Sequence, residues 1–465
     1  MRRGRPTRGQ AHGRSPLASQ APQADRIAPA RRVAYRILLQ IATTDAHSDD
    51  LLRSPEVDAL SALDRNLTTT LVLGTLRWQL ALDARIRELL ARPDARLSDE
   101  AATALRMGAY QLLFLERIPA HAVLHDSVEL VKQSKEGAAA GMVNAVLRNI
   151  QRAGLQPPAP EAAHPAWMVE RWVKRYGLAA AEAICRWDQE PARVTLRVGG
   201  AQTEMAGTEP GFFLSSARRV VRREPGENPA PGESPARIQD EASQLVAELL
   251  AAQADEAANA EAPLRVLDTC AAPGGKTAIL AERLPKAEIT AMDVSRKRIE
   301  GMRRILPPSI TAPLRFEVAD AATMDLKPEW DLILCDVPCS GTGTMARNPE
   351  IRQRANERDL LRQQARQAAI LRAALRGLKP GGRLLYSTCS LEPEENEQVV
   401  EGALREASGV RIVPVAPILD RLSQQSVVTP EGRERLRSAI DGDFLRTIPG
   451  VHSCDGFFAA VLRKQ

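Results

Sequence analysis

The spacing of hydrophobic residues changes once along this chain, near residue 264. Upstream, between residues 27 and 153, apolar positions recur every three to four residues, as in "LTTTLVLGTLRWQLALDARIRELL" and "GMVNAVLRNIQRA". Short polar breaks such as "RPDARLS" and "RIPA" separate the repeats. This spacing is typical of amphipathic helices that bury one face. We therefore predict a compact all-α bundle over residues 27–153.

The segment that follows has a mixed pattern. Residues 154–165 are rich in proline and alanine, which predicts a linker. Within residues 166–235, "AWMVERWVKRYG" has a helical pattern, "RVTLRV" resembles a strand and "REPGENPAPGESPA" begins a predicted loop, so we expect a small subdomain. An Ala/Glu-rich stretch of low complexity ends before Pro263, and we expect it to be an exposed insertion.

Apolar runs alternate with helical stretches from Leu264 onward. The runs are "LRVLDT", "EITAMDV", "LRFEVAD", "DLILCDVP" and "GRLLYSTC". Strands rich in Val, Ile and Leu with helices between them are typical of a parallel sheet covered on both faces. The sequence thus predicts an α/β domain over residues 236–465 and a multidomain chain overall.

Each predicted strand of this domain ends near an acidic or thiol side chain. These residues are Asp268, Asp293, Asp320, Asp336 with Cys339, and Cys389. Ligands of open α/β sheets bind at the edge where the strands have their carboxyl ends. Five such strand ends in a row predict one functional site at that edge.

The stretch "DTCAAPGGKT" lies between the first predicted strand and its helix. Its Gly-Lys-Thr resembles a phosphate-binding loop, but that motif requires glycine where this chain has Cys270. A glycine turn remains, which either lets the backbone approach a ligand or simply closes a tight turn. Asp293 follows Gly274 by 19 residues, where a carboxylate binds ribose hydroxyls in nucleotide-binding sheets. The GxGxxG spacing of a dinucleotide site is absent.

The chain has six cysteines, none of them in the CxxC pair that a zinc finger requires. His121 and His125 lie four residues apart but lack a glutamate partner, so we predict no metal site. Free cysteines are usually small buried side chains. We expect this role for Cys185, Cys270, Cys335 and Cys454.

Cys339 and Cys389 differ from the others because they follow neighbouring predicted strands. Adjacent parallel strands lie about 4.8 Å apart, so we expect both thiols to converge on one pocket with Asp336. Two thiols, a carboxylate and a nucleoside-type site fit methylation of carbon 5 of cytosine. That carbon becomes nucleophilic when a thiolate adds to carbon 6, and a base must then remove the carbon 5 proton. A neighbouring carboxylic acid can stabilise the developing charge through N3.

Several stretches, in order, resemble the RNA cytosine-5 methyltransferase family, the NOL1/NOP2/Sun group. They are "DTCAAPGGKT", "AMDVSRKR", "FEVADA", "DVPCSGTG", "LKPGG" and "YSTCSLEPEENE", flanked by "IQDEAS" and "HSCDGFFAAVLR". The resemblance implies a Rossmann-like methyltransferase domain that uses S-adenosyl-L-methionine. It also implies that Cys389 is the nucleophile, that Cys339 serves product release and proton abstraction, and that Asp336 contacts the target base.

The same resemblance implies a cofactor site. Its glycine turn and Lys276 would surround the methionine end of the cofactor, Asp293 its ribose and Asp320 its adenine. The implied cofactor-binding set is Cys270, Ala271, Ala272, Pro273, Gly274, Gly275, Lys276, Asp293, Arg298, Asp320 and Asp336. The family often has tryptophan where this chain has Gln353, which predicts an altered contact near the base.

The helical part, with "RIPAHAVLHDSVEL" and "NAVLRNI", resembles a NusB-type RNA-binding domain. The combination is similar to bacterial enzymes of this family that act on 16S ribosomal RNA. It implies a monomer whose partner is 16S rRNA, free or in an early assembly particle. Transfer RNA or 23S rRNA as substrate, a non-catalytic RNA-binding assembly or antitermination factor, and a nicotinamide dehydrogenase are the alternatives.

Composition changes this picture little. Apolar content is 44%, no apolar run is long enough to span a membrane and no secretory signal opens the chain, so we expect a cytoplasmic protein. Residues 1–25 carry +4 of the net charge of +5, and we predict that residues 1–26 form a disordered basic arm. Aromatic residues make up only 3%, so we expect RNA recognition through Arg and Lys contacts and base extrusion. The candidates for these RNA contacts are Lys174, Arg175 and Arg347, and the alternative is that they are ordinary solvated side chains.

For "EPEENE" we predict an acidic helix start.

Overall fold

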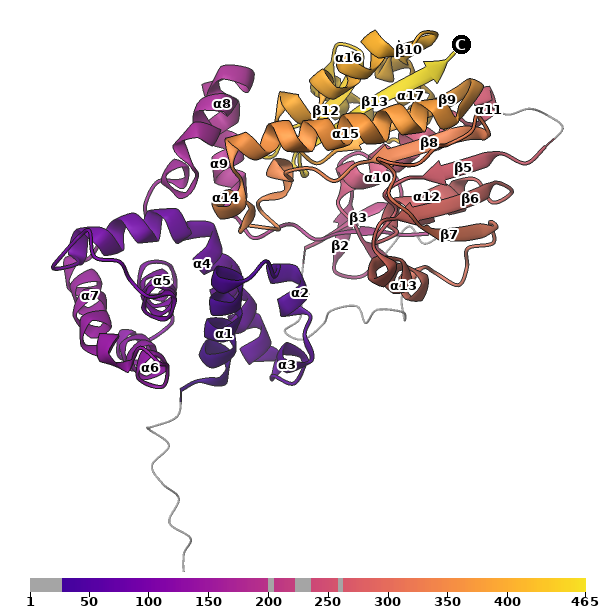
Figure 1. Cartoon of the computed structure of the whole chain (residues 1–465). Helices are drawn as coiled ribbons and strands as arrows, with labels where there is room; N and C mark the ends of the chain where they lie inside the picture. Colours follow the sequence, from indigo (N-terminus) through magenta and orange to yellow (C-terminus); the bar gives the residue numbers. More distant parts are fainter. Residues whose placement is uncertain (1–26, 200–204, 222–235, 258–261) are drawn as a thin grey trace, which may run out of the picture.

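The computed structural model describes residues 27–199, 205–221, 236–257 and 262–465 (Figure 1). The predicted basic arm lies outside these ranges, as does most of the predicted loop "REPGENPAPGESPA". In Figure 1 a helical body, drawn in indigo and purple, lies beside a larger body that is built around a sheet.

Helices form the part of the chain up to Ala153. They are α1 (Pro29–Thr43), α2 (Ser48–Leu52), α3 (Pro55–Asp58), α4 (Ala62–Leu89), α5 (Asp99–Phe114), α6 (Ala120–Lys132) and α7 (Ala140–Ala153). Ser61 and Ser98 cap α4 and α5, because each side chain accepts a hydrogen bond from a first-turn N–H. The apolar stripes of α1, α4, α5, α6 and α7 share one buried core. The predicted all-α bundle is confirmed.

A small α/β unit connects the bundle to the large sheet. It consists of α8 (Ala166–Tyr176), α9 (Leu178–Gln189), β1 (Thr195–Arg197), β2 (Thr208–Pro210), β3 (Ala217–Val220) and β4 (Arg237–Ile238). The four short strands pair in the order β2-β3-β1-β4, and all three pairings are antiparallel. The helix and the strand that the pattern predicted here are both present.

The predicted parallel strands form the centre of the large sheet. They are β5 (Arg265–Asp268), β6 (Glu288–Asp293), β7 (Leu314–Val318), β8 (Trp330–Asp336) and β9 (Leu378–Thr388). Their order is β7-β6-β5-β8-β9, so the chain changes direction across the sheet between β5 and β8. In open α/β sheets the crevice at such a switch point is where ligands bind.

Helices cover both faces of this sheet, as the apolar strands require. One buried core packs the sheet against α10 (Glu241–Ala251), α12 (Gly275–Arg283) and α17 (Val415–Gln424). The other packs it against α15 (Glu357–Gly377) and α16 (Glu397–Glu406). Further helices of this part are α13 (Arg296–Ile305), α14 (Ile351–Arg354) and α18 (Pro430–Arg435).

Antiparallel strands extend the sheet beyond β9. They are β10 (Val410–Val413), β11 (Ile440–Asp441), β12 (Phe444–Thr447) and β13 (Phe457–Lys464). β13 pairs with β9 from Phe458 opposite Thr388 to Arg463 opposite Arg383. The strand that carries Cys389 at its end is therefore held between two neighbours, β8 and β13.

The prediction that the Ala/Glu-rich stretch is an exposed insertion is wrong for residues 251–254, which are buried, whereas Asp255 and Glu256 are exposed. Helix α11 (Ala254–Ala257) packs near the sheet, and Ala254 is buried. Glu256 pairs with Arg383 of β9 and with Arg421 of α17. Local composition cannot reveal these partners, which lie more than 120 residues away in sequence.

The helical bundle contacts the large domain through the segment that follows the Cys339 loop. Arg354 donates to the carbonyl oxygen of Ala46 at 2.6 Å, and Arg352 donates to that of Arg77 at 2.6 Å. Arg77 in turn donates to the carbonyl oxygen of Ala346 at 2.9 Å. The bundle is thus hydrogen-bonded to the chain just downstream of the thiol loop.

Candidate functional site

The two thiols that follow β8 and β9 meet. The strands are parallel neighbours, with Asp336 opposite Ser387 in the register. Cys339 lies three residues beyond the end of β8 and Cys389 directly beyond β9, and their Sγ atoms are 3.4 Å apart. All six cysteines are free, so the pair is a thiol contact and not a disulfide.

The surroundings of Cys339 favour its protonated form. Its hydrogen bond with Cys389 and its burial raise the pKa of the Cys339 thiol well above the ordinary value. In the contact itself, either sulfur can be the donor.

Asp336 is held from two sides beside the thiols. Its Oδ2 accepts a hydrogen bond from Lys276 Nζ at 2.7 Å, and its Oδ1 accepts one from Ser387 Oγ at 2.7 Å. Lys276 comes from the first turn of α12, after the glycine turn, so this ion pair joins the ends of β5 and β8. Both partners are donors, so Asp336 is held as a hydrogen-bond acceptor.

The carboxylates of β6 and β7 lie at the same edge of the sheet. Asp293 is almost fully buried, accepts from the N–H of Ser295 at 2.9 Å and pairs with Arg298 at 3.2 Å. Asp320 accepts from the N–H of Ala322 at 3.0 Å. These backbone contacts fix the two carboxylates along the edge, where polar groups of a ligand can reach them.

One cavity of about 290 Å³ connects these groups. Its acidic and thiol lining comes from the ends of β5, β6, β7, β8 and β9, and its apolar lining includes Val294, a residue that is 53% exposed. Carboxylates for hydroxyl and amino groups, next to an exposed apolar side chain for a planar base, fit a nucleoside-type ligand. The thiols of Cys339 and Cys389 lie in the lining of the same cavity, so a ligand bound there would share one space with both sulfur atoms.

Family models match three successive parts of the chain. One described as "16S rRNA methyltransferase RsmB/F" matches residues 252–463, one for the NusB family matches residues 28–152, and one for an RsmF/B-like ferredoxin-like domain matches residues 164–207. The chain is 35% identical to the ribosomal RNA small subunit methyltransferase B of Xanthomonas campestris, over 86% of this chain and 89% of that protein. This chain belongs to the ribosomal RNA small subunit methyltransferase B family.

Other members of the family align over nearly the whole length. The probable ribosomal RNA small subunit methyltransferase B of Bacillus subtilis is 31% identical, over 94% of this chain and 98% of that protein. The crystal structure of PH0851 shares the fold, with a TM-score of 0.74 and 22% identity over 94% of this chain and 99% of that one. Membership confirms the resemblance and the NusB-like bundle that the sequence predicted.

Most of the residues predicted for the family site line the cavity. The catalytic candidates Asp336, Cys339 and Cys389 are among them. The cofactor candidates in the lining are Cys270, Ala272, Asp293, Arg298, Asp320 and Asp336. The remaining cofactor candidates, Ala271, Pro273, Gly274, Gly275 and Lys276, are not part of the lining.

The glycine turn itself is packed against protein. Gly274 has φ +109°, and a Cβ there would lie 2.8 Å from the side chain of Met302. A Cβ on Gly275 would lie 3.1 Å from the amide of Gln239. The turn thus brings α12 close to its neighbours, and Lys276 reaches the site through Asp336.

The sequence patterns did not single out Arg366 of α15, which also lines the cavity beside the thiols. The residue is exposed, and among the described residues it has no hydrogen-bond or ion-pair partner. An exposed arginine on a helix has no distinctive local signal. Only the packing of α15 against the thiol edge brings Arg366 to this cavity.

Two of the three basic candidates pair with acidic residues of the protein. Arg347 donates to Asp455 at 2.6 Å and to Asp240 at 3.0 Å, so it joins "IQDEAS" to "HSCDGFF". Arg175 pairs with Glu397 and Asp441.

Gln353, for which the sequence predicted an altered contact near the base, bonds to the helical bundle. Its Nε2 donates to the carbonyl oxygen of Leu76 at 3.0 Å. The side chain joins the two domains, together with its neighbours Arg352 and Arg354.

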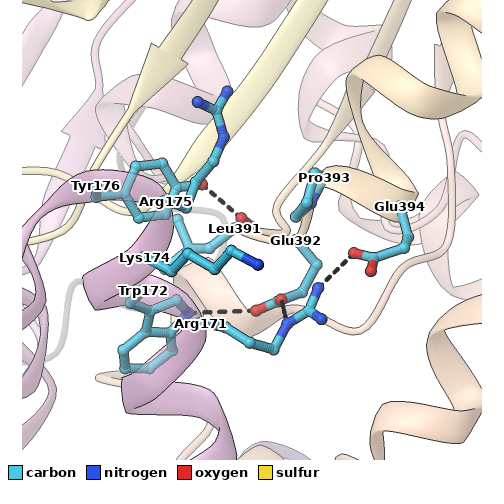
Figure 2. Close-up of a pocket in the computed structure, with 9 residues that line it drawn as sticks. All are labelled: Arg171, Trp172, Lys174, Arg175, Tyr176, Leu391, Glu392, Pro393 and Glu394. Carbon is cyan, nitrogen blue, oxygen red and sulfur yellow. Dashed lines mark hydrogen bonds and ion pairs between the residues drawn. The ribbon is translucent and has the colours of Figure 1, made fainter.

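The acidic stretch "EPEENE" does more than begin a helix. Glu392 and Glu394 hold Arg171 of α8 at 2.8 and 2.5 Å, next to a groove of about 300 Å³ (Figure 2). Tyr176 donates to the carbonyl oxygen of Leu391 in the same groove. The small unit is therefore fastened to the loop that follows Cys389.

In the described part of the chain, no helix is long and apolar enough to cross a membrane.

Proposed function

We propose that this protein methylates carbon 5 of a cytosine in 16S ribosomal RNA, with S-adenosyl-L-methionine as cofactor. Family membership supports an rRNA methyltransferase, because the relatives carry that name and the model that matches residues 252–463 has that description. The single observation that carries the finer proposal is the pair of thiols 3.4 Å apart beside an acidic, nucleoside-sized cavity.

The cofactor would occupy the side of the cavity formed by the ends of β6 and β7. Asp293 would bind the ribose hydroxyls, and Val294 and Asp320 would flank the adenine. When bound, S-adenosyl-L-methionine supplies an activated methyl group.

Cys389 is the proposed nucleophile. Its thiolate, stabilised by the proton of Cys339, forms a bond to carbon 6 of the ring, and the electron pair of the carbon 5–carbon 6 double bond makes carbon 5 nucleophilic. After carbon 5 is methylated, a base removes its proton, the double bond re-forms and the sulfur of Cys389 leaves as a thiolate. We assign this base to Cys339: once Cys389 is bonded to carbon 6 it no longer carries the negative charge that retains the Cys339 proton, so Cys339 releases that proton to solvent and its thiolate takes the proton from carbon 5.

Asp336 would hold the cytosine in the pocket. Because it is an acceptor from Lys276 and Ser387, it can also accept a hydrogen bond from the exocyclic amino group of the base. This differs from the N3 contact by a carboxylic acid that the sequence suggested. The ammonium group of Lys276 would lie nearby and stabilise the negative charge that develops on the ring.

The test is transfer of labelled methyl groups to unmodified 16S rRNA, with transfer RNA and 23S rRNA as competing substrates and bisulfite mapping of the product. We expect label at one cytosine of 16S rRNA and none with Cys389→Ala. Normal turnover by Cys389→Ala, or label on a base other than cytosine, would refute the proposal.

A further inference from the structure

A single buried carboxylate connects the two thiol loops. Glu395 accepts hydrogen bonds from the N–H of Ser340 at 2.8 Å, from the hydroxyl of Ser340, and from the hydroxyl of Ser390 at 2.5 Å. Ser340 directly follows Cys339 and Ser390 directly follows Cys389. The residue after each thiol is therefore held by the same side chain.

Gln367 of α15 completes the contacts of this carboxylate. Its Nε2 donates to Glu395 Oε1 at 2.9 Å and to the carbonyl oxygen of Pro338 at 3.0 Å. The side chains of Glu395 and Gln367 are both fully buried. Every group that contacts the two carboxylate oxygens is a donor, which matches an ionised carboxylate, since that group only accepts.

The main chain around Glu395 is also fixed. Tyr386 donates to its carbonyl oxygen at 2.6 Å. The neighbouring Asn396 donates to the carbonyl oxygen of Ser390 at 2.9 Å and accepts from Thr388 at 2.5 Å. With its backbone held, the carboxylate is a fixed point to which the loops are attached.

We propose that Glu395 is a positioning residue that sets the separation of the two sulfur atoms and directs the negative charge of the pair to Cys389. This inference rests on the proposed function and adds a residue to it. Glu395 does not line the catalytic cavity, so it acts through Ser340 and Ser390 and not on the base.

The charge of Glu395 supports the second part of this role. A buried carboxylate beside the Cys339 loop opposes a further negative charge there. It adds to the effects of the Cys389 hydrogen bond and of burial, which raise the pKa of Cys339. Cys339 thus keeps its proton and donates it to the contact with Cys389.

Glu395→Gln keeps the shape of the side chain and removes its charge. We expect kcat to fall about 100-fold, because small displacements of reacting groups have effects of that size, while KM for RNA and for cofactor stays within about two-fold. In the free protein, we expect iodoacetamide to label Cys389 before Cys339, as mapped by mass spectrometry. In Glu395→Gln we expect that preference to fall at least about ten-fold, since the charge that opposes a Cys339 thiolate is gone.

Glu394→Gln is the matched control. It makes the same change one residue earlier, on a carboxylate that binds Arg171, and should leave both kcat and the labelling ratio unchanged. Thermal melts of both variants separate positioning from general loss of structure. If Glu395→Gln fails to fold, Ser390→Ala replaces it, because that variant removes the bond from the Ser390 hydroxyl to Glu395 and keeps the carboxylate. We then expect a smaller shift of the ratio in the same direction.

The inference is overturned if a folded Glu395→Gln variant keeps the wild-type kcat and the wild-type labelling ratio. Where Ser390→Ala is the substitute, the same result in that variant overturns it. The labelling measurement needs no RNA and no cofactor. If the proposed methylation is not observed, the labelling ratio still tests the positioning role of Glu395. Failure of the proposed function and failure of this inference are therefore distinguishable.

Discussion

The Sγ atoms of Cys339 and Cys389 lie 3.4 Å apart although the residues are 50 positions apart in the sequence. The connection between them is a parallel crossover, in which the chain leaves β8, forms α15 and returns as β9 beside its starting strand. Because parallel neighbours end at the same edge, residues just beyond their carboxyl ends are brought together. This relationship underlies the predictions below.

Replacing Cys339 with alanine should trap the reaction. In Cys339→Ala the nucleophile Cys389 is intact, whereas the proposed base for release is missing, so a covalent protein–RNA adduct should accumulate. A denaturing gel with labelled 16S rRNA detects it as a shifted band. Cys389→Ala should give no such band. A folded Cys339→Ala without an adduct would contradict the role assigned to Cys339 in release.

Arg366 should contribute to RNA binding through a phosphate. It lines the mouth of the thiol cavity without a protein partner among the described residues. Removing one phosphate contact lowers affinity and reduces the slope of log K against log salt by about 1. We therefore expect Arg366→Ala to bind 16S rRNA about ten-fold more weakly at low salt, as measured by filter binding. Arg372→Ala, on the same helix but paired with Glu406, is the control and should keep the wild-type slope.

We expect the raised pKa of Asp268 to make the free energy of unfolding decrease as pH rises. Burial, with the charge of Asp336 as a smaller contribution, raises the pKa of Asp268 from 3.8 to about 7, while Thr277 opposes the shift. The folded protein therefore keeps a proton that the unfolded chain loses, and the resulting stability is complete below about pH 4 and is lost as pH rises through 7.

The matching experiment compares urea unfolding of wild type and Asp268→Asn at several pH values. A shift of this size corresponds to about 4 kcal/mol at most, so the free energy of unfolding of wild type should decline relative to the variant between pH 4 and 7. Parallel curves for the two proteins would show that Asp268 does not keep its proton.

Gly343 should tolerate no side chain. A Cβ there would lie 2.4 Å from the carbonyl oxygen of Gly456, and the N–H of Gly343 donates to the carbonyl oxygen of Cys389 at 2.9 Å. Gly343→Ala forces the two backbones apart and should lower the free energy of unfolding by about 1–3 kcal/mol. Gly402→Ala, in α16 with no neighbour closer than 3.7 Å, should instead raise it by up to about 1 kcal/mol. Thermal or chemical unfolding measures both, and equal effects of the same sign would contradict the close approach.

The strand ends show what could be predicted from local pattern. The apolar runs that end at Asp268, Asp293 and Asp336 are strands that stop at those residues. Spacing along the chain determines which side chains follow each strand, and parallel pairing then collects them at one edge. For this reason the thiol pair and most of the cavity lining could be predicted from the sequence.

Contacts between distant segments of the chain could not be predicted from the sequence. Gln353 and Arg347 have no local signal for their true partners, Leu76 in the first case and Asp240 and Asp455 in the second. The antiparallel strands beyond β9 were missed as well, because short apolar strands resemble many other segments.

The sequence by itself determined the helical bundle, the parallel sheet, and the acids and thiols at the strand ends, because these follow from the period of apolar residues and from the motifs. Only the tertiary structure decided how the thiol pair is held: Glu395 meets Ser340 55 residues away and Gln367 28 residues away. Such contacts arise because packing α15 and the loop after β9 against the sheet buries polar groups. Once buried, those groups must bond to whichever partners the fold brings within reach.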